Sequence, residues 1–188
     1  MSSKKRTTKK RFSQEEWLEK ALRALAKEGG SVLSVDALAK HLGVSRGSFY
    51  WHFKDKSDFV LQLVDYWIEV YTKSIIDYLE QMDISADKKL LLLMEKIVTE
   101  RLTQYDISIR AWASHDPVAS RKVKKNDELR YNFVRSLFSE IGFKGEELEM
   151  RTRTFVVYNS LETGLFYKLS KKKQFDQMKL RHTMLTRK

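Results

Sequence analysis

The sequence predicts an all-α protein. Only one of the 188 residues is Pro and seven are Gly, and few segments show the alternation of apolar and polar residues that is typical of strands. Apolar residues instead recur at three- and four-residue spacing, as they do on one face of a helix. The length allows a small helical head joined to a larger helical domain, and we expect about nine helices.

The net charge of +11 is distributed unevenly along the chain. Residues 1–60 carry 13 Lys and Arg against seven Asp and Glu, whereas residues 61–167 carry 15 against 17. A basic first part followed by a near-neutral middle predicts that the first part binds a polyanion. Residues 168–188 carry eight basic residues and one acidic residue. This composition fits polyanion binding, and it fits a solvated helix end equally.

Three absences restrict the setting in which we expect this protein. There is no Cys, so the chain has no disulfide framework and no thiolate site, which fits a reducing compartment. The longest apolar run is Leu90 to Met94, far shorter than the ~20 residues of a membrane span. The sequence also begins without the apolar core of a signal peptide. We therefore expect a cytoplasmic protein with no membrane partner.

Residues 1–11, MSSKKRTTKKR, contain six basic residues and no acidic one. Such a run is disordered on its own and often serves as an arm that binds nucleic acid. It would then enter a minor groove. A solubilising tail would have the same composition, so both interpretations remain open.

The first helix has a clear beginning and end. Ser13 and Glu16 form a capping box, and Phe12 and Trp17 occupy the positions of a hydrophobic staple. Gly29 and Gly30 then end the helix. We expect it to support the two helices that follow.

Residues 34–58, SVDALAKHLGVSRGSFYWHFKDKSD, predict a helix-turn-helix. Ser34 is a good N-cap, and Gly43 ends that helix, since a residue without Cβ adopts the left-handed conformation easily. Ser45 caps a second helix over about residues 46–53, with Phe49 and Phe53 as its inward anchors. Two short helices joined by such a turn place the second helix in a DNA major groove.

The run GVSRGSFYWHFKDKSDFV resembles the helix-turn-helix signature of the TetR family of bacterial transcriptional repressors. The resemblance covers about residues 12–60, a quarter of the chain. It implies a head at residues 12–58 and a helical ligand-sensing and dimerisation domain at residues 59–188. A repressor of this kind binds a palindromic operator as a homodimer and responds to a small-molecule effector.

The second helix offers candidate DNA contacts. Arg46 and Ser48 face outward near its start, and Arg is the residue that most often contacts guanine. The remaining candidates should contact mainly the phosphate backbone; they are Ser34, Ser45, Tyr50, Trp51, His52 and Lys56. Of these, His52 could contact either a phosphate or a base.

A long helix over about residues 56–81 connects the head to the rest of the chain. Because its apolar residues extend along its whole length, we expect its first part to pack under the head and its second part to join another core. Four more helices follow, and Asp116 and Pro117 clearly begin one of them. We expect them, and a last helix, at residues 86–105, 107–114, 117–141, 146–169 and 173–185.

The second domain is less specific in sequence. Candidates for an effector pocket are aromatic and polar residues of the middle helices: Tyr71, Met94, Arg101, Trp112, Tyr131, Tyr158 and Asn159. Ordinary core or dimer packing is the competing interpretation for each. The helix at 146–169 is apolar over much of its circumference, so a second copy of the chain should cover one face. Its candidate contacts are Tyr158, Leu161, Gly164 and Leu165.

The sequence also bears on two other functional classes. The four His residues lack metal-ligand spacing, and no nucleotide-binding or nucleophile motif is present, so we expect no enzyme, metal or cofactor. A constitutive, non-specific architectural DNA-binding protein would fit the charge alone. It does not account for the helix-turn-helix signature or the near-neutral second half, so the sequence favours the repressor.

Overall fold

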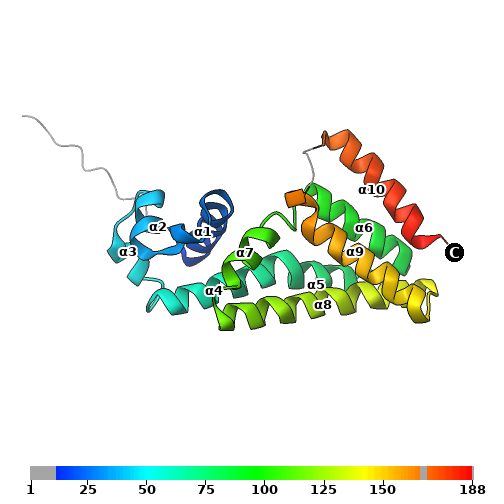
Figure 1. The fold of residues 1–188 in the computed structure, drawn as a ribbon, viewed down its shortest axis with the longest axis horizontal. Helices are drawn as coiled ribbons and strands as arrows, with labels where there is room; N and C mark the ends of the chain where they lie inside the picture. Colours follow the sequence, from blue (N-terminus) through cyan, green and yellow to red (C-terminus); the bar gives the residue numbers. More distant parts are fainter. Residues whose placement is uncertain (1–11, 166–168, 188) are drawn as a thin grey trace, which may run out of the picture.

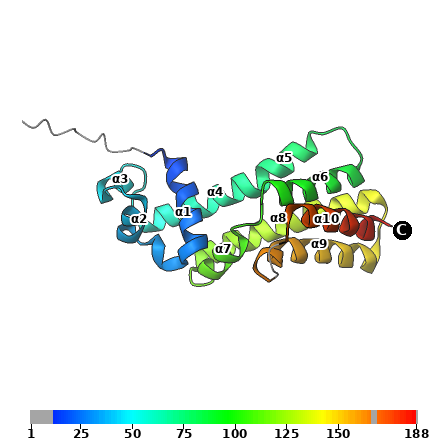
Figure 2. The same ribbon diagram turned by 90° about the horizontal axis from the view of Figure 1, so that it is seen from above.

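The computed structural model describes residues 12–165 and 169–187. Its secondary structure is helical, with no strand in these ranges, which confirms the all-α prediction. The molecule is elongated, with α1 to α3 at one end and α10 toward the other (Figures 1 and 2). Helix α8 runs alongside α4, and α5 continues the path of α4 toward the far end (Figures 1 and 2).

The head has the expected short helices. The capping box of α1 is present, with the Ser13 hydroxyl accepting from Glu16 N at 3.1 Å and Ser13 N donating to the Glu16 carboxylate at 2.8 Å. Gly43 ends the second helix in the left-handed conformation, at φ 68°. The third helix ends earlier than expected, and Trp51 begins a turn. The head elements are α1 (Gln14–Glu28), the 3₁₀ turn η1 (Gly30–Leu33), α2 (Val35–Leu42) and α3 (Arg46–Tyr50).

Buried aromatic rings hold α3 against the rest of the head. The Phe49 ring lies 5.9 Å from the Trp17 ring and 5.3 Å from the Phe59 ring, in edge-to-face geometry. Phe53 packs on Phe59 with ring centroids 4.9 Å apart. All four side chains are almost fully buried. Because α3 uses these rings as anchors, its other residues are directed away from the core.

The connecting helix is continuous but not uniform. It consists of α4 (Lys56–Ile68), the π-helical turn η2 (Glu69–Lys73) and α5 (Ser74–Glu80). Phe59 and Trp67 belong to the core of the head, whereas Ile76 and Leu79 belong to a second core, as the sequence predicted. The junction between the two cores therefore coincides with a π turn, a feature found mostly at functional sites.

The remaining helices follow the predicted order, and one boundary differs clearly. The helix expected over residues 86–105 ends at Thr99, and Arg101 adopts φ 55°, so the chain turns there. This turn buries Leu102, Thr103 and Tyr105 between the two cores. The helices are α6 (Ala86–Thr99), α7 (Asp106–Ala113), α8 (Pro117–Ile141), α9 (Gly145–Leu165) and α10 (Lys171–Thr186).

The first core extends beyond the head. It includes Ile109 and Ala113 of α7 and Ala119 and Val123 at the start of α8. The second core is formed by α5, α6, the rest of α8, α9 and α10. Helix α7 thus packs on the head, although it lies some 50 residues later in the chain. This arrangement ties the head to the helices that surround the second core.

Candidate functional site

The outer surface of α3 and the turn after it expose two large aromatic side chains. Trp51 is 85% exposed and Tyr50 51% exposed, while the neighbouring Phe49 and Phe53 are buried. Burial of two rings and exposure of two others within five residues gives this segment one packed side and one free side. An apolar ring held in solvent is the informative exception to ordinary burial, and it marks α3 as a contact surface.

Arg46 lies at the start of α3 and forms an ion pair with Asp36 of α2, with 3.0 Å between Nε and Oδ1. Both side chains are mostly exposed, and such a pair contributes at most about 1 kcal/mol. The guanidinium is therefore free to exchange Asp36 for another acceptor at small cost. Ser48, two residues further along α3, is half-buried.

The other predicted contact residues lie in the same part of the head. The Ser34 hydroxyl accepts from Ala37 N at 3.3 Å and so caps α2. Ser45 occupies the N-cap of α3, yet its hydroxyl makes no bond to the first turn. His52 is half-buried, and Lys56 is exposed at the start of α4. All eight predicted residues thus belong to α2, α3, α4 or the turns between them.

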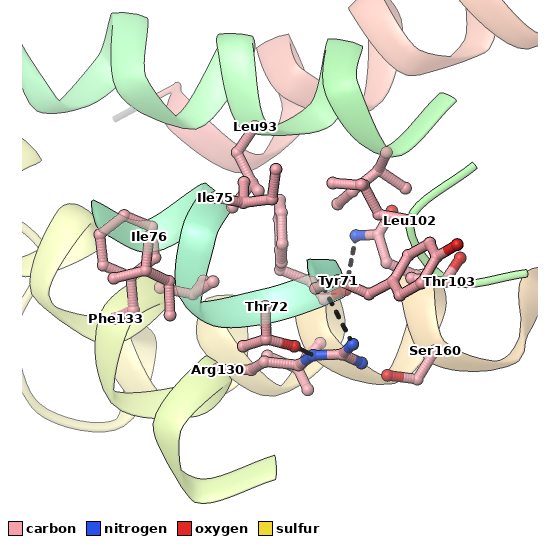
Figure 3. Close-up of a pocket in the computed structure, with 15 residues that line it drawn as sticks. Tyr71, Thr72, Ile75, Ile76, Leu93, Leu102, Thr103, Arg130, Phe133 and Ser160 are labelled. Carbon is pink, nitrogen blue, oxygen red and sulfur yellow. Dashed lines mark hydrogen bonds between the residues drawn. The ribbon is translucent and has the colours of Figure 1, made fainter. Parts of the chain in front are cut away.

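A cavity of about 60 Å³ lies where α6, α8 and α9 meet the connecting helix (Figure 3). Most of its walls are aliphatic or aromatic, and its polar side chains come from η2, α8, α9 and the turn after α6. The lining residues are Tyr71, Thr72, Ile75, Ile76, Leu93, Ile97, Leu102, Thr103, Arg130, Phe133, Val134, Phe155, Val156, Asn159 and Ser160.

Arg130 is the charged residue of this lining, and Asp106 neutralises it. The two side chains form an ion pair with a 2.5 Å contact, and Asp106 is fully buried. Arg130 Nε also donates to the Thr72 hydroxyl at 2.8 Å, so the guanidinium lies between η2 and Ser160 (Figure 3). Burial raises the pKa of Asp106, an effect that the positive charge of Arg130 opposes.

Two of the seven predicted pocket residues, Tyr71 and Asn159, line this cavity. Met94 is buried in the second core, and Arg101 is exposed at the turn after α6. Trp112 packs on η1, where a Cβ added to Gly30 would come within 2.9 Å of its ring.

The last two predicted pocket residues also lie outside the cavity. Tyr131 donates a hydrogen bond to Glu149. Tyr158 donates to Glu162 and stacks under Arg181. Their hydroxyl groups thus have partners of their own within the helix bundle. Arg110 of α7 is likewise paired, with Asp127 of α8.

The cavity is connected to the head through Glu19 of α1. Tyr71 of η2 and Tyr105 both donate hydrogen bonds to the Glu19 carboxylate, at 3.0 and 3.2 Å. Burial, reinforced by the charge of Glu19, raises the pKa of both hydroxyl groups, so they remain donors at physiological pH. We call this arrangement the Glu19 clasp. Arg23 of α1 binds the same carboxylate at 2.9 Å.

Exposed apolar side chains lie on α9 and α10. Met150, Val157 and Leu161 follow one another at helical spacing on α9, and Leu180 and Met184 do so on α10. The two helices are neighbours, because Arg151 of α9 donates to the Leu185 carbonyl of α10 at 2.7 Å. Leu161 belongs to this face, whereas Tyr158 is half-buried. Gly164 and Leu165 belong to the last turn of α9, where only the backbone is described.

The described residues lack two further kinds of feature. No helix among them is long and apolar enough to cross a membrane. No cluster of three or more His, Asp or Glu side chains in that part of the chain could hold a metal ion. The basic arm at residues 1–11 lies outside the described residues.

Comparison with known proteins identifies the head. Residues 18–63 match the family model described as bacterial regulatory proteins, tetR family. The HTH-type transcriptional regulator AcrR of Shigella flexneri is 54% identical over 41 residues, which are 22% of this chain and 19% of AcrR. The uncharacterised HTH-type transcriptional regulator YwcC of Bacillus subtilis is 31% identical over 113 residues. That alignment covers 60% of this chain and half of YwcC, so the chain matches at most half the length of these two relatives.

A solved structure extends the similarity to nearly the whole fold. AibR, determined in complex with isovaleryl coenzyme A and operator DNA, superposes with a TM-score of 0.72. The superposition covers 93% of this chain and 98% of AibR at 15% sequence identity, so it shows a shared fold. The match over residues 18–63 therefore assigns the head to the bacterial regulatory proteins of the tetR family, and the shared fold extends over most of the chain.

Proposed function

We propose that the chain is a homodimeric repressor that binds a palindromic operator and releases it when a small-molecule effector binds. The surface of α3 and the turn after it supports this proposal. Arg46, Tyr50 and Trp51 are exposed there, and buried aromatic rings hold the segment in place. A head of this build presents a rigid second helix to a major groove.

The residues of the head divide into two roles. Arg46 and Ser48 contact base edges and give sequence preference. Tyr50, Trp51, Ser34 and Lys56 contact phosphate and fix the register, as does the unused hydroxyl of Ser45. His52 contacts either a phosphate or a base. Arg46 exchanges Asp36 for a DNA acceptor on binding, because the DNA phosphates repel the Asp36 carboxylate.

Dimerisation uses the apolar face of α9 and α10. Met150 and Met184 are each about two-thirds exposed, an unfavourable state for a monomer with several such neighbours. A second copy would cover this face, with Leu161 and Tyr158 at its edge and Gly164 and Leu165 further along α9. Two heads held about one helical turn of DNA apart, or a modest multiple, then read a palindrome.

The cavity is the proposed effector site, and the Glu19 clasp is the proposed route to the head. Tyr71 of η2 lines the cavity and also donates a hydrogen bond to Glu19 of α1. A displacement of η2 therefore moves a residue that is bonded directly to the head. An effector must bind the DNA-bound and released arrangements with different affinity, since equal affinity shifts nothing. The AibR complex, which contains both a coenzyme A ester and operator DNA, supports an effector-responsive regulator of this fold.

Selection of duplexes from a random library, followed by affinity measurements, tests the proposal. We expect the selected duplex to bind roughly 10³-fold or more tightly than random duplex at one stated salt concentration. A constitutive architectural protein would give a ratio near one, and that result would contradict the proposal. The oligomeric state is measured in the same preparation, and a stable monomer contradicts it equally.

Substitutions of the head separate base reading from phosphate binding. Arg46→Ala should relax preference at one operator position by about 1–3 kcal/mol. Tyr50→Phe should weaken binding to all sequences alike, because a phosphate contact carries no sequence information. Lys88→Ala is the control, since Lys88 is an exposed basic residue of α6 that belongs neither to the head nor to the exposed apolar residues of α9 and α10.

A further inference from the structure

The charge of the cavity wall restricts the ligand. Arg130 is the charged side chain among the lining residues, and its partner Asp106 is fully buried beside it. An anionic ligand would have to compete with Asp106 for the guanidinium, and a cationic ligand would lie next to a like charge. The remaining walls are mainly Ile, Leu, Val and Phe. The cavity therefore favours an uncharged and largely apolar ligand.

Asn159 adds one polar requirement. It is 4% exposed and lines the cavity. Its Nδ2 donates to the Phe155 carbonyl at 2.7 Å, which fixes the orientation of the amide. The other atom, Oδ1, is buried and has no hydrogen-bond partner. A buried acceptor left unsatisfied is unfavourable, so a ligand that donates to Oδ1 would satisfy it.

The cavity is too small to hold a ring-sized ligand unless part of its wall moves. Its volume is about 60 Å³, whereas a cavity that holds benzene measures roughly 150 Å³. A ring-sized ligand must therefore displace part of the wall. Tyr71 and Thr72 of η2 form one side of it (Figure 3), and π turns often occur where helices adapt to function.

We propose that this cavity binds a compact, uncharged and mainly apolar molecule that donates a hydrogen bond to Oδ1 of Asn159, as an alcohol or a phenol does. The identity of this ligand class rests on the effector role proposed above. Binding satisfies the orphan acceptor, leaves the Arg130–Asp106 pair intact and pushes η2 outward.

Four single-ring probes of similar size test the ligand class on the full chain by calorimetric titration. Phenol donates a hydrogen bond, anisole and toluene do not, and benzoate carries a negative charge. We expect phenol to bind roughly 2- to 10-fold more tightly than anisole or toluene, and benzoate to bind weakest. Equal binding of phenol and anisole, tightest binding of benzoate, or no saturable binding of any probe would each overturn the proposal.

Two asparagine variants locate the effect. Asn159→Leu should abolish the preference for phenol while toluene still binds. Asn126→Leu is the matched control, because Asn126 is equally buried, has unpartnered amide atoms and lies outside the cavity, so the preference should persist. Loss of the preference in both variants would overturn the assignment to Asn159. If Asn159→Leu does not fold, the comparison of phenol with anisole on the unaltered chain still decides.

The test separates this inference from the proposed function. Affinity for the selected duplex is measured in the same preparation without any probe. Specific DNA binding without a phenol preference overturns the ligand class alone. A phenol preference without specific DNA binding overturns the repressor and leaves the cavity chemistry standing.

Discussion

The surface of α3 and the cavity beside η2 use polar groups in opposite ways. On α3, Arg46 is paired with Asp36 in solvent and the apolar rings Phe49 and Phe53 are inside. Around the cavity, Arg130 and Asp106 are paired inside, and the bundle is built around them. Arg46 can therefore exchange Asp36 for a phosphate or a base at little cost in free energy, whereas Arg130 is held in one place by Asp106.

Because of this difference, the exposed residues of the α3 surface should serve binding, whereas the buried pair beside the cavity should serve the stability of the fold. Exposed contacts contribute little to folding and can be optimised for binding. Buried pairs are costly to break, because the remaining charge has no solvent to stabilise it. Substitutions of the exposed residues of α3 and the turn after it should therefore change DNA binding alone, while substitutions beside the cavity should first change the stability of the fold.

The largest expected effect comes from Asp106→Asn. It leaves the Arg130 guanidinium buried without its carboxylate, which should lower the free energy of unfolding by about 3–5 kcal/mol. Urea unfolding at a fixed protein concentration measures the change, since the stability of a dimer depends on concentration. Asp36→Asn, the same chemical change at the exposed Arg46 pair, should cost less than about 1 kcal/mol. Equal losses in the two variants would remove the contrast.

Trp51→Ala should show the reverse pattern. Because Trp51 makes little contact with the core, its removal should change the free energy of unfolding by less than about 0.5 kcal/mol. Affinity for duplex DNA should fall by about 1–3 kcal/mol, since large aromatic side chains dominate many interfaces. Fluorescence anisotropy with the selected duplex measures this, and Tyr78→Ala, an exposed aromatic of α5, is the control. A stability loss without an affinity loss would assign Trp51 to the fold.

The two regions also differ in how far the sequence predicts them. The head could be predicted almost completely, because its caps, its turn glycine and its aromatic anchors lie within about 50 consecutive residues. The cavity collects side chains from Tyr71 to Ser160, so no local pattern describes it. Tyr71 and Asn159 were predicted as polar or aromatic residues on middle helices, but Arg130, Asp106 and Thr72 were missed.

One signal for Arg130 was present in the sequence. It lies at helical spacing between Val123 and Leu137, on the buried stripe of α8 that also holds Asn126 and Phe133. A charged residue occupies such a stripe only when it is paired. The partner could not be identified, because Asp106 stands 24 residues away at the start of another helix. The early end of α6 at Thr99 was equally hidden, since neither Gly nor Pro marks the turn at Arg101.

The smallest expected effect tests the link between the two regions. Tyr71→Phe removes one hydrogen bond to Glu19, worth about 0.5–1.5 kcal/mol, and leaves the packing of the ring on Tyr105. Hydrogen exchange should then become roughly 2- to 10-fold faster at the buried amides of α1, because local opening of the head becomes easier. Tyr78→Phe on the exposed face of α5 should leave exchange unchanged. A double-mutant cycle with Glu19→Met, which removes the acceptor, should give a coupling energy of about the same size. Additive effects of Tyr71→Phe and Glu19→Met would mean that the clasp carries no energy between the cavity and the head.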